Sequence, residues 1–506
     1  MISPDSDRFT KVDRSQLLMF SRSLDERIED GDMVRLVEQF VANLDLVPFY
    51  EKYSAEGGRV LPVDTMLSIL LLAYSQDIYS SRRIAWQVKK NADFIYLSGD
   101  REISYKAISE FRRIHLGAIR PVLAQFGGLA VELGLVDPEK VFNDGVKLKA
   151  NASDNKTKSA AQWVEEFQKM EARAESFLKR AEEADQKEEA LGGDRELYKV
   201  RNANKAAELL AELAEQQARV AELAAEGRFA DGAKVNITDP DASFKKVNGK
   251  ITTAHEVQVA SSNQYALAVT ESPAPAEHAL GELLDEVREA TGRYPEVCAQ
   301  DAEYHTSENI SAAVQRGVLP LSPEAAMETG KGAAKAGRGY GYHRFEYDVE
   351  QDCYRCPGGR TLDFVGQSKP GPSAGRNYKC RSGCDSCPLR EECFRDPGRL
   401  HQRHLWVDDR KQLRVFVLSV LATHYGRAIY RKRKQDIEVV FAGVKHNHLV
   451  RRLLLRGWPK VVGEFRLLLL VNNLRKLRLR LGWDGEIRDR LRTLWVAGEA
   501  EAVGAT

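Results

Sequence analysis

The distribution of the cysteines constrains what this chain can fold into more than any other feature of its sequence. Six of the seven cysteines fall between residues 353 and 393. Two thiolates separated by two residues can bind one tetrahedral ion, and a structural Zn²⁺ with four sulfur ligands suits a small, loop-rich unit that lacks an apolar core of its own. The segment therefore predicts a structural zinc site. Its candidate ligands are Cys353, Cys356, Cys380, Cys384, Cys387 and Cys393.

Six thiols exceed the four ligands of a tetrahedral zinc site, so the spacing alone leaves the ligand set open. We expect Cys384 and Cys387 to be two of the four ligands. An iron–sulfur cluster and a group of buried free thiols are the alternatives to zinc. The preferred ligand set is Cys356, Cys384, Cys387 and Cys393, with Cys353 and Cys380 as alternates.

Length and composition indicate a soluble, multidomain protein. A chain of 506 residues with 43% hydrophobic and 29% charged residues is ordinary for a globular protein and suggests about three or four units. No uninterrupted apolar run reaches the roughly 18 residues needed to span a bilayer. The N-terminal sequence MISPDSDRF lacks the basic and then apolar layout of a secretory signal. We therefore expect a cytoplasmic protein whose cysteines stay reduced.

The charge is unevenly distributed along the chain, although the formal net charge is only +1. Residues 401–480 contain 19 Lys and Arg against 5 Asp and Glu, whereas residues 161–230 contain 11 against 16. Lys and Arg that contact phosphates release counterions and supply most of the sequence-independent affinity for nucleic acid. The C-terminal part is therefore a candidate polyanion-binding surface, although solvated helix faces can have the same composition.

Residues from about Asp32 to Leu133 have the apolar spacing of helices, which predicts an all-helical first domain. Within it, SSRRIAWQVKKNADFIYLSGD followed by ISYKAISEFRRIH has the outline of a helix-turn-helix, with Ser104 as a candidate N-cap. A small helical bundle with a basic surface is the alternative interpretation. The candidate DNA contacts on the second helix are Lys106, Arg112 and Arg113.

The pattern then changes to one that predicts a mixed α/β sheet. VFNDGVKL is typical of a strand with Asp144 near its middle, and the charged segment from about Ala161 to Glu226 is typical of an inserted helical hairpin. ITTAHEVQVASS and QYALAVTESPA flank Asn263 and predict a β-hairpin. The succession PEVCAQDAEY, SENISAAVQRG and VLPLS adds strand, helix and strand, which brings Asp301 to a strand end.

Three acids stand out by their context. Asp144 and Asp301 occur at or after apolar strands, and Glu438 opens the apolar part of a helix written DIEVVFAGVKH. Carboxylates in such places are costly to desolvate unless they bind cations. Converging carboxylates that hold two Mg²⁺ or Mn²⁺ ions can support phosphoryl transfer. For each acid considered by itself, a role as a helix-capping or turn residue is the simpler interpretation.

The basic sequence around Glu438 supplies further candidates for contact with nucleic acid. If RAIYRKRKQDIEVVFAGVKHNH is helical, Glu438 and Lys445 lie on one side of the helix. The earlier residues can contact a DNA backbone or stack on an unpaired base, and solvated charge on a surface helix is the alternative for each. The candidates are Tyr430, Arg431, Arg433, Lys434, Lys445 and His446.

The pieces FNDGVKLKANAS, AQDAEYHTSENI and YRKRKQDIEVVFAGVKHNH resemble, in this order, the three acidic motifs of bacterial insertion-sequence DDE transposases. The similarity extends to CPGG, CDSCPLREEC and RGWPKVVGEFRLLLLVNNLRKL, and it is strongest to the subgroup usually numbered IS eleven-eighty-two. The resemblance implies an RNase H-like catalytic domain in which Asp144, Asp301 and Glu438 bind the metal ions. It also implies that Tyr430, Arg433 and Lys445 match the family's Tyr-Arg-Glu-Lys signature.

Two positions depart from the family pattern. Four residues separate Arg433 from Glu438 where the related motif has three, so Lys434 can take the place of the arginine. Glu303 occupies a position where a glycine is usual. Glu438 and Lys445 keep the family's spacing.

The predicted architecture is a multidomain α/β protein with a helical N-terminal domain, an RNase H-like mixed β-sheet core, an inserted helical hairpin and a cysteine-rich zinc-type insert. The expected boundaries are 1–135 for the helical DNA-binding domain, 136–160 for the first part of the catalytic core, 161–230 for the hairpin, 231–325 for the core continued, 326–405 for the cysteine-rich insert and 406–506 for the basic C-terminal helices that complete the core.

The predicted activity is binding of insertion-sequence ends, DNA cleavage and joining of 3′-hydroxyl ends to target DNA by two-metal phosphoryl transfer. The expected partners are double-stranded DNA and a second copy of the chain, with no membrane, and the expected location is the nucleoid of a bacterial cytoplasm. The rival functions are a catalytically inactive DNA-binding relative and a nuclease that cuts without joining.

Overall fold

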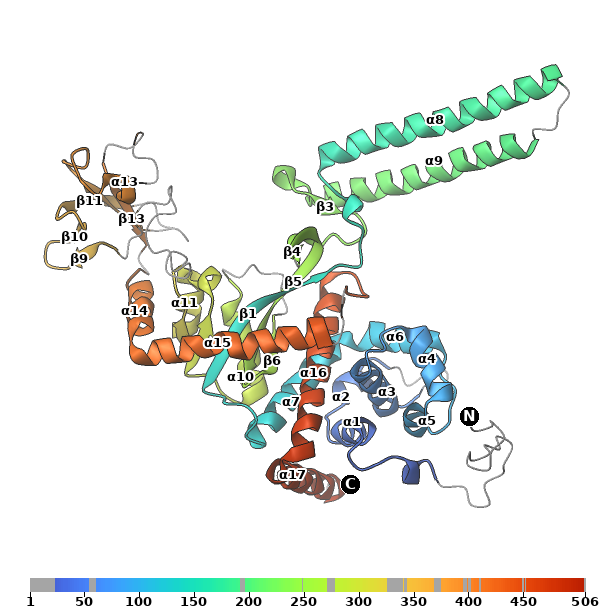
Figure 1. The fold of residues 1–506 in the computed structure, drawn as a ribbon, viewed down its shortest axis with the longest axis horizontal. Helices are drawn as coiled ribbons and strands as arrows, with labels where there is room; N and C mark the ends of the chain where they lie inside the picture. The colour runs from blue at the N-terminus through green and yellow to red at the C-terminus, as the bar shows by residue number, and fades with distance from the viewer. Residues whose placement is uncertain are drawn as a thin grey trace, which may run out of the picture. The chain divides into compact units, whose positions relative to one another are not determined.

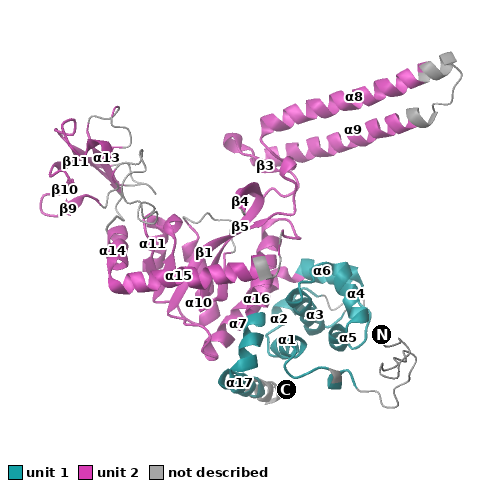
Figure 2. Ribbon diagram, viewed as in Figure 1, with its two compact units in different colours: residues 1–114, 474–506 teal, residues 115–473 magenta. Residues whose placement is uncertain are grey.

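The computed structural model describes residues 23–53, 61–191, 196–247, 249–270, 278–324, 340, 344–367, 375–394, 398, 402–408, 411–447, 450 and 452–504 (Figure 1). The chain divides into two compact units (Figure 2). Unit 1 comprises Met1–Ile114 and Leu474–Thr506, and unit 2 comprises His115–Asn473.

Unit 1 is helical wherever the structure describes it, as the apolar spacing predicts. Its central helix, Val63–Ser75, is buried over almost its whole length because apolar residues occupy most of its positions on all sides. Ser104 accepts a hydrogen bond from the N–H of Ala107, which confirms the predicted N-cap. The helices are α1 (Met33–Ala42), α2 (Val47–Tyr50), α3 (Val63–Ser75), α4 (Ser81–Lys90), α5 (Ala92–Ser98), α6 (Tyr105–His115), the end of α16 (Trp458–Trp483) and α17 (Gly485–Gly504).

One stretch among the described residues, Tyr105–Glu132, has the length and apolar composition that would allow it to cross a membrane. Half of its apolar window is buried inside the protein, and core helices of soluble proteins meet the same criterion. The stretch consists of α6, the 3₁₀ turn Leu116–Ala118 and α7 (Ile119–Glu132).

Unit 2 is built on a mixed sheet of six strands. From one edge the main order is β4, β5, β1, β7 and β8, and β6 pairs with the other part of the long β5. β1 is antiparallel to β5 and parallel to β7, and β7 is parallel to β8. The mixed sheet that the sequence predicts is therefore present, including the hairpin around Asn263. The strands are β1 (Lys140–Lys149), β4 (Ser243–Val247), β5 (Lys250–Ser262), β6 (Tyr265–Val269), β7 (Val297–Gln300) and β8 (Leu319–Leu321).

Helix α16 covers the exposed edge of β6. The side-chain oxygen of Asn473 accepts from the N–H of Ala266 at 3.0 Å, and the amide of Asn473 donates to the carbonyl of Ala266 at 2.8 Å. A strand edge without a partner would leave backbone groups unsatisfied. This buried asparagine therefore satisfies both backbone groups of Ala266 at the edge of β6.

The other helices of unit 2 pack along the sheet. α7 and α10 (Leu280–Thr291) contact each other and β6, and α11 (Ser307–Gln315) and α14 (Lys411–Ala422) contact β8. α15 (His424–Ala442) contacts β1, β5 and β7, as Figure 1 shows. The position of α15 therefore brings the middle of this helix to the three central strands.

The charged segment after β1 forms the predicted pair of helices, α8 (Ala160–Leu191) and α9 (Glu196–Ala225), which pack side by side (Figure 1). A short pair of strands, β2 (Thr157–Lys158) and β3 (Val235–Asn236), closes the base of the hairpin. Trp163 and Leu223 pack there with Val235 and Ile237. The base of the hairpin therefore has its own small apolar core.

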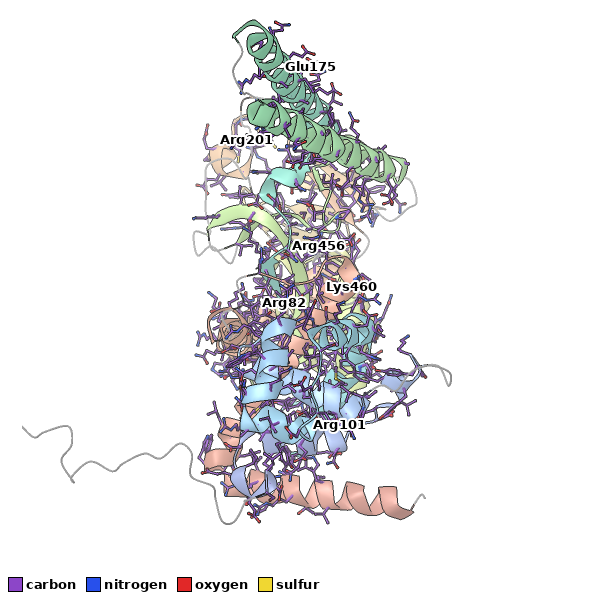
Figure 3. All side chains as sticks on the ribbon, turned by 90° about the vertical axis from the view of Figure 1, so that its right-hand side faces the viewer. Arg82, Arg101, Glu175, Arg201, Arg456 and Lys460 are labelled. Carbon is purple, nitrogen blue, oxygen red and sulfur yellow. The ribbon has the colours of Figure 1, made fainter. Side chains whose placement is uncertain are left out.

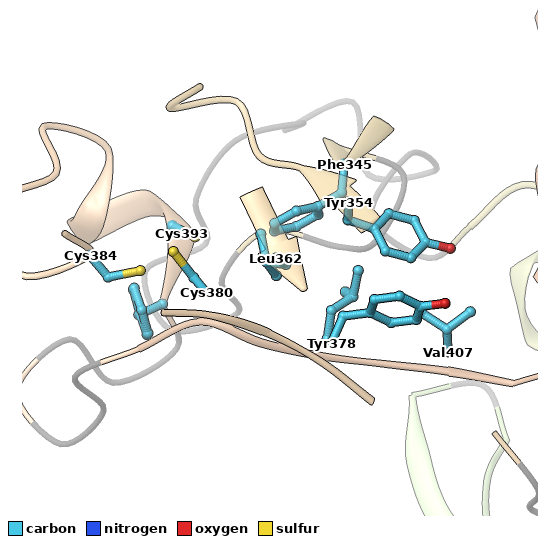
Figure 4. Packing of buried hydrophobic residues seen from close by; sticks show 10 residues of the cluster. Phe345, Tyr354, Leu362, Tyr378, Cys380, Cys384, Cys393 and Val407 are labelled. Carbon is cyan, nitrogen blue, oxygen red and sulfur yellow. The ribbon is translucent and has the colours of Figure 1, made fainter. Parts of the chain in front are cut away.

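The cysteine-rich segment has more regular structure than its sequence predicts. Its five antiparallel strands are β9 (Glu346–Asp348), β10 (Cys353–Arg355), β11 (Thr361–Gln367), β12 (Gly375–Cys380) and β13 (His404–Asp408). Leu362 and the aromatic side chains of Phe345, Tyr354 and Tyr378 form a buried cluster between them (Figure 4). The expectation that this segment lacks an apolar core is therefore wrong, because tyrosines and phenylalanines of alternating strands supply one.

A buried ion pair connects α10, α16 and the end of β6. Arg466 Nη2 lies 2.5 Å from Glu286 Oε1 and donates to the carbonyl of Val269, whose own N–H donates to Glu286. Removing one partner of a buried pair leaves the other charge uncompensated and costs about 3–5 kcal/mol. We therefore expect Arg466→Met to lower the midpoint of thermal unfolding markedly.

The double variant Arg466→Met, Glu286→Gln removes both charges and tests the cause. It is expected to regain much of the lost stability, because no buried charge is left without a partner. An unchanged unfolding midpoint for Arg466→Met alone would contradict the assigned role of the pair.

Candidate active site

Asp144 lies in the middle of the central strand β1. Its neighbours Phe142 and Val146 are buried, whereas the side chain of Asp144 is 23% exposed. One carboxylate oxygen, Oδ2, lies 2.9 Å from Nη1 of Arg433 on α15. Burial raises the pKa of Asp144, and the charge of Arg433 partly offsets that rise. A carboxylate in this position is therefore held on the sheet by a cation from the helix.

Asp301 follows the last residue of β7 and lies beside Asp144. The parallel register pairs Asn143 with Gln300, so the next residue of each strand brings the two acids side by side. Asp301 caps a short 3₁₀ turn by accepting the N–H of Glu303 at 3.0 Å. Burial and the nearby carboxylate of Asp144 raise the pKa of Asp301 to about 6. The predicted position of Asp301 at a strand end is confirmed.

Glu438 belongs to α15 and is exposed, whereas Ile437 and Val440 belong to the buried side of the helix. The expectation that it lies on a core-facing helix side is therefore wrong in detail. Its charge raises the pKa of Asp144, which indicates that the two carboxylates lie within electrostatic range. The structure therefore brings together acids from β1, from the end of β7 and from α15.

A π-helical turn, Gly443–Asn447, follows α15 and positions Lys445. Such turns are frequent at functional sites because they change the direction in which side chains point. Gly443 permits the close approach of α16, since a Cβ there would lie 2.2 Å from Oδ1 of Asn472. Burial lowers the pKa of Lys445, Asp144 opposes that shift, and Lys147 adds to it. The ammonium of Lys445 is therefore within electrostatic range of Asp144.

Two buried residues that the sequence did not single out support the acids. Asp436 accepts from Ser261 Oγ at 2.6 Å and from the N–H of Gln264 at 2.9 Å, which attaches α15 to the β5–β6 hairpin. Tyr304 is almost fully buried, and its hydroxyl donates to Gln258 on β5. The charges of Asp144 and Asp301 help to raise the pKa of Tyr304. An alternation of apolar and polar residues could not identify either residue, since their partners are distant in sequence.

The side chains of the three acids are not arranged as a coordination shell for a metal ion. Across the ranges that the structure describes, no group of three or more His, Cys, Asp or Glu side chains is arranged to hold a metal ion. The donors nevertheless suit Mg²⁺ chemically, because it prefers carboxylate oxygens. Asp144 is paired with the guanidinium of Arg433, which supplies positive charge beside it.

The remaining candidates on α15 differ in exposure. Arg431 and Lys434 are exposed, and Tyr430 is partly buried with its ring 5.7 Å from the guanidinium of Arg433. Arg433 itself is buried and bonded to Asp144, so the structure contradicts its expected place on a DNA-facing surface. The side chain of His446 lies outside the described residues.

Among the candidates on α6, Lys106 and Arg113 are exposed, and Arg113 pairs with Glu110. Arg112 is buried and donates to the hydroxyl of Tyr74 and the carbonyl of Tyr79. The expectation that Arg112 contacts DNA is therefore wrong, because its guanidinium bonds inside unit 1.

Two of the clustered cysteines, Cys380 and Cys393, have a raised pKa to which neighbouring thiols of the segment contribute. The pKa of Cys393 is raised by burial and by the thiols of Cys356, Cys384 and Cys387, although Arg403 opposes the shift. Burial and a hydrogen bond with Cys384 raise the pKa of Cys380 to about 11. Figure 4 shows Cys380, Cys384 and Cys393 together at one end of the aromatic cluster.

Cys353 differs from the other five cysteines of the segment. Its thiol hydrogen-bonds with the side chain of Gln351 at 3.9 Å. Burial and the acids Asp348 and Asp363 raise its pKa, while Arg355 opposes that shift. Its surroundings are therefore acidic rather than sulfur-rich.

The raised pKa of Asp301 predicts that the stability of the folded protein depends on pH. The unfolded chain releases this proton at about pH 3.9, and the folded chain releases it at about 6. Stability is therefore lost as the pH rises through this window and stays lower above it. Without metal ions, Asp301→Asn should unfold at a higher temperature than the wild type at pH 7.5 and at a similar temperature at pH 4. Partial exposure limits the difference to about 1–2 kcal/mol.

The control for this prediction is Glu303→Gln, which removes an exposed carboxylate from the same turn. Because the charge of Glu303 is only the smallest of the causes that raise the pKa of Asp301, this variant should narrow the difference between the two pH values only slightly. A wild type that remains as stable as Asp301→Asn at pH 7.5 would contradict the assigned desolvation of Asp301.

Comparisons with known proteins match two parts of the chain. Residues 355–478 match the family model described as Transposase DDE domain, and residues 22–113 match the one described as Transposase domain (DUF772). No curated protein matches the chain. The first match includes Glu438 and Lys445, and the second covers most of the described N-terminal helices. Together the two matches support a DDE transposase of an insertion element, which implies DNA binding and suggests an enzyme that cuts and joins DNA.

Proposed function

We propose that the chain binds the ends of an insertion sequence, cleaves DNA there and joins the freed 3′-hydroxyl ends to target DNA. The observation that carries this proposal is that Asp144 on β1 and Asp301 at the end of β7 are neighbours, with Glu438 of α15 within electrostatic range of Asp144. The carboxylate of Asp144 helps to raise the pKa of Asp301, and that of Glu438 helps to raise the pKa of Asp144, as expected of a site that favours positive charge.

The order of the strands supports an RNase H-like core. β1 is central, with the antiparallel β5 and β6 on one side and the parallel β7 and β8 on the other. This arrangement puts the first acid on the central strand and the second at the end of its parallel neighbour. The similarity of the motifs to the insertion-sequence subgroup numbered eleven-eighty-two agrees with such a core.

The chain's own residues have separate tasks in the proposed reaction. Asp144, Asp301 and Glu438 would hold two Mg²⁺ or Mn²⁺ ions, which would supply activation of the attacking oxygen and stabilisation of the leaving oxygen. Lys445 neutralises charge on the scissile phosphate region, and Arg433 holds the carboxylate of Asp144 in position. Water first cuts the end of the element, and the released 3′-hydroxyl then attacks the target without a covalent link to the protein.

The other parts of the chain serve this reaction. The helical N-terminal residues, 1–135 in the proposed division, and the basic helices of 406–506 bind double-stranded DNA through exposed side chains such as Lys106, Arg113, Arg431 and Lys434. Two ends have to be paired for joining, so we propose a dimer or a larger assembly on DNA, in a bacterial cytoplasm.

Strand transfer with purified protein tests the function. The full chain is incubated with a labelled element end, a target plasmid and Mg²⁺, and cleaved and joined products are separated on a gel. Asp301→Asn should lose at least about 100-fold of both products, since losing even an outer partner of a metal ligand costs 10- to 100-fold. Glu303→Gln, which removes an exposed neighbouring carboxylate, should retain most of the activity.

The two alternative functions, an inactive DNA-binding relative and a nuclease, predict different products in the same experiment. Binding without cleavage by the wild type would support the inactive relative, and cleavage without a joined product would support the nuclease. Equal activity of Asp301→Asn and the wild type would remove Asp301 from the site.

We also propose a structural Zn²⁺ bound in the cysteine-rich segment by Cys356, Cys384, Cys387 and Cys393, with Cys380 as the alternate. The set is supported because the thiols of Cys356, Cys384 and Cys387 all contribute to the raised pKa of Cys393. The N–H of Arg360 donates to the sulfur of Cys356 at 3.3 Å. Four thiolates would cross-link the strands of the segment to the short helix α13 (Arg390–Cys393).

The zinc content of the purified full chain tests this proposal. The wild type should contain a stoichiometric amount of zinc by mass spectrometry of the metal, and Cys387→Ser should lose most of it. Cys353→Ser is the matched control, because its thiol faces Gln351, and it should keep the metal. A wild type purified without zinc, or loss of zinc from Cys353→Ser alone, would overturn the proposed ligand set.

A further inference from the structure

Helix α4 of unit 1 buries one apolar side and exposes a large aromatic ring on the other side. Ile84 and Val88 are buried and attach the helix to the rest of the unit. The opposite side exposes Trp86, which keeps 59% of its surface accessible. Among the described residues no ring or cation contact covers this indole. A single exposed apolar residue is ordinary on a protein surface, so the charges and rings around Trp86 have to indicate what its exposure serves.

The cations around Trp86 indicate the charge of that partner. Arg82, Arg83 and Lys90 are exposed and form no ion pair with the described residues, whereas Lys89 pairs with Glu102 at 2.7 Å. Figure 3 shows Arg82 on the surface of unit 1. The partner of this side of α4 is therefore negatively charged.

A second aromatic residue extends the surface. Tyr105, the first residue of α6, is 41% exposed, and the guanidinium of Arg82 lies 5.3 Å from the centre of its ring. The packing of Arg82 on Tyr105 reduces the freedom of the arginine and directs it along the side of α4. Cations interleaved with exposed aromatic rings are typical of surfaces that bind unpaired nucleotides.

The charge of the N-terminal residues is uneven, and the excess of cations lies in the part that contains α4. Residues 80–113 contain eight Lys and Arg against four Asp and Glu, whereas residues 23–53 contain three against eight. A polyanion is therefore attracted to the part that contains α4 and repelled from the part that contains α1 and α2. This asymmetry distinguishes a nucleic acid from an uncharged partner.

We propose that α4 binds DNA that has an unpaired base, with Trp86 stacked on that base and with Arg82, Arg83 and Lys90 on the neighbouring phosphates. The proposal rests on the proposed function, because a cut element end supplies such DNA. It places the contact on the exposed side of α4, whereas the sequence had suggested α6. A duplex exposes base faces only at its ends, so an exposed indole favours unpaired DNA over an intact duplex.

Fluorescence anisotropy of labelled DNA tests the proposal with the full chain and without divalent cations, so that no cleavage occurs. The two probes are a duplex with a short single-stranded thymine extension and the same duplex with blunt ends. Trp86→Ala should bind the extended probe about 5- to 150-fold more weakly, the range of one base–aromatic stack, and the blunt probe with little change. Trp86→Phe should fall between the two proteins on the extended probe.

Arg82→Ala tests the phosphate contact. It should weaken binding of both probes and reduce by about one the slope of log affinity against log salt. Lys52→Ala is the matched control, since Lys52 is an exposed cation in the acidic segment 23–53, and it should bind both probes like the wild type. The thermal unfolding midpoint of each variant shows whether the fold is kept.

Three results would overturn the proposal: unchanged binding by Trp86→Ala, equal losses on the two probes, or an effect of Lys52→Ala as large as that of Arg82→Ala. These outcomes are separate from a failure of the proposed function, which appears as absence of cleavage and joining by the wild type in Mg²⁺. Binding through α4 can hold in a chain that does not cut, and cutting can occur in a chain whose α4 does not bind.

Discussion

The candidate site depends on how α15 is attached to the sheet. Two of its buried charged residues form that attachment: Arg433 pairs with Asp144 on β1, and Asp436 accepts from Ser261 and from the backbone of Gln264. Both are costly to bury without partners, so these contacts determine the position of the helix against the strands. Glu438 follows Asp436 by two residues, and its distance from Asp144 is therefore a consequence of this attachment.

The same arrangement explains why the acids are strained without a cation. Two carboxylates side by side on parallel strands repel each other, and burial adds to the cost, which the raised pKa of Asp301 reports. Arg433 offsets part of this cost at both acids, through its ion pair with Asp144 and through its charge near Asp301. A bound divalent cation would offset the rest of the repulsion between Asp144 and Asp301.

The regular patterns were well predicted from the sequence, whereas several side-chain roles were not. The N-cap at Ser104, the paired helices after β1 and the strand-end position of Asp301 follow from local rules of capping and periodicity. Arg112 was misassigned because a basic residue on a helix has the same local pattern whether it faces solvent or the hydroxyl of Tyr74. The aromatic core of the cysteine-rich segment was missed because its members come from separate strands.

The sequence by itself determined the order of helical and strand segments, the cysteine cluster and the identity of the three acids as candidates, since these depend on residue type and spacing along the chain. The tertiary structure decided that Asp144 and Asp301 are neighbours, that Arg433 faces inward and that Trp86 faces outward. Strand register and helix rotation set those relations, and both result from contacts between residues that are far apart in the chain.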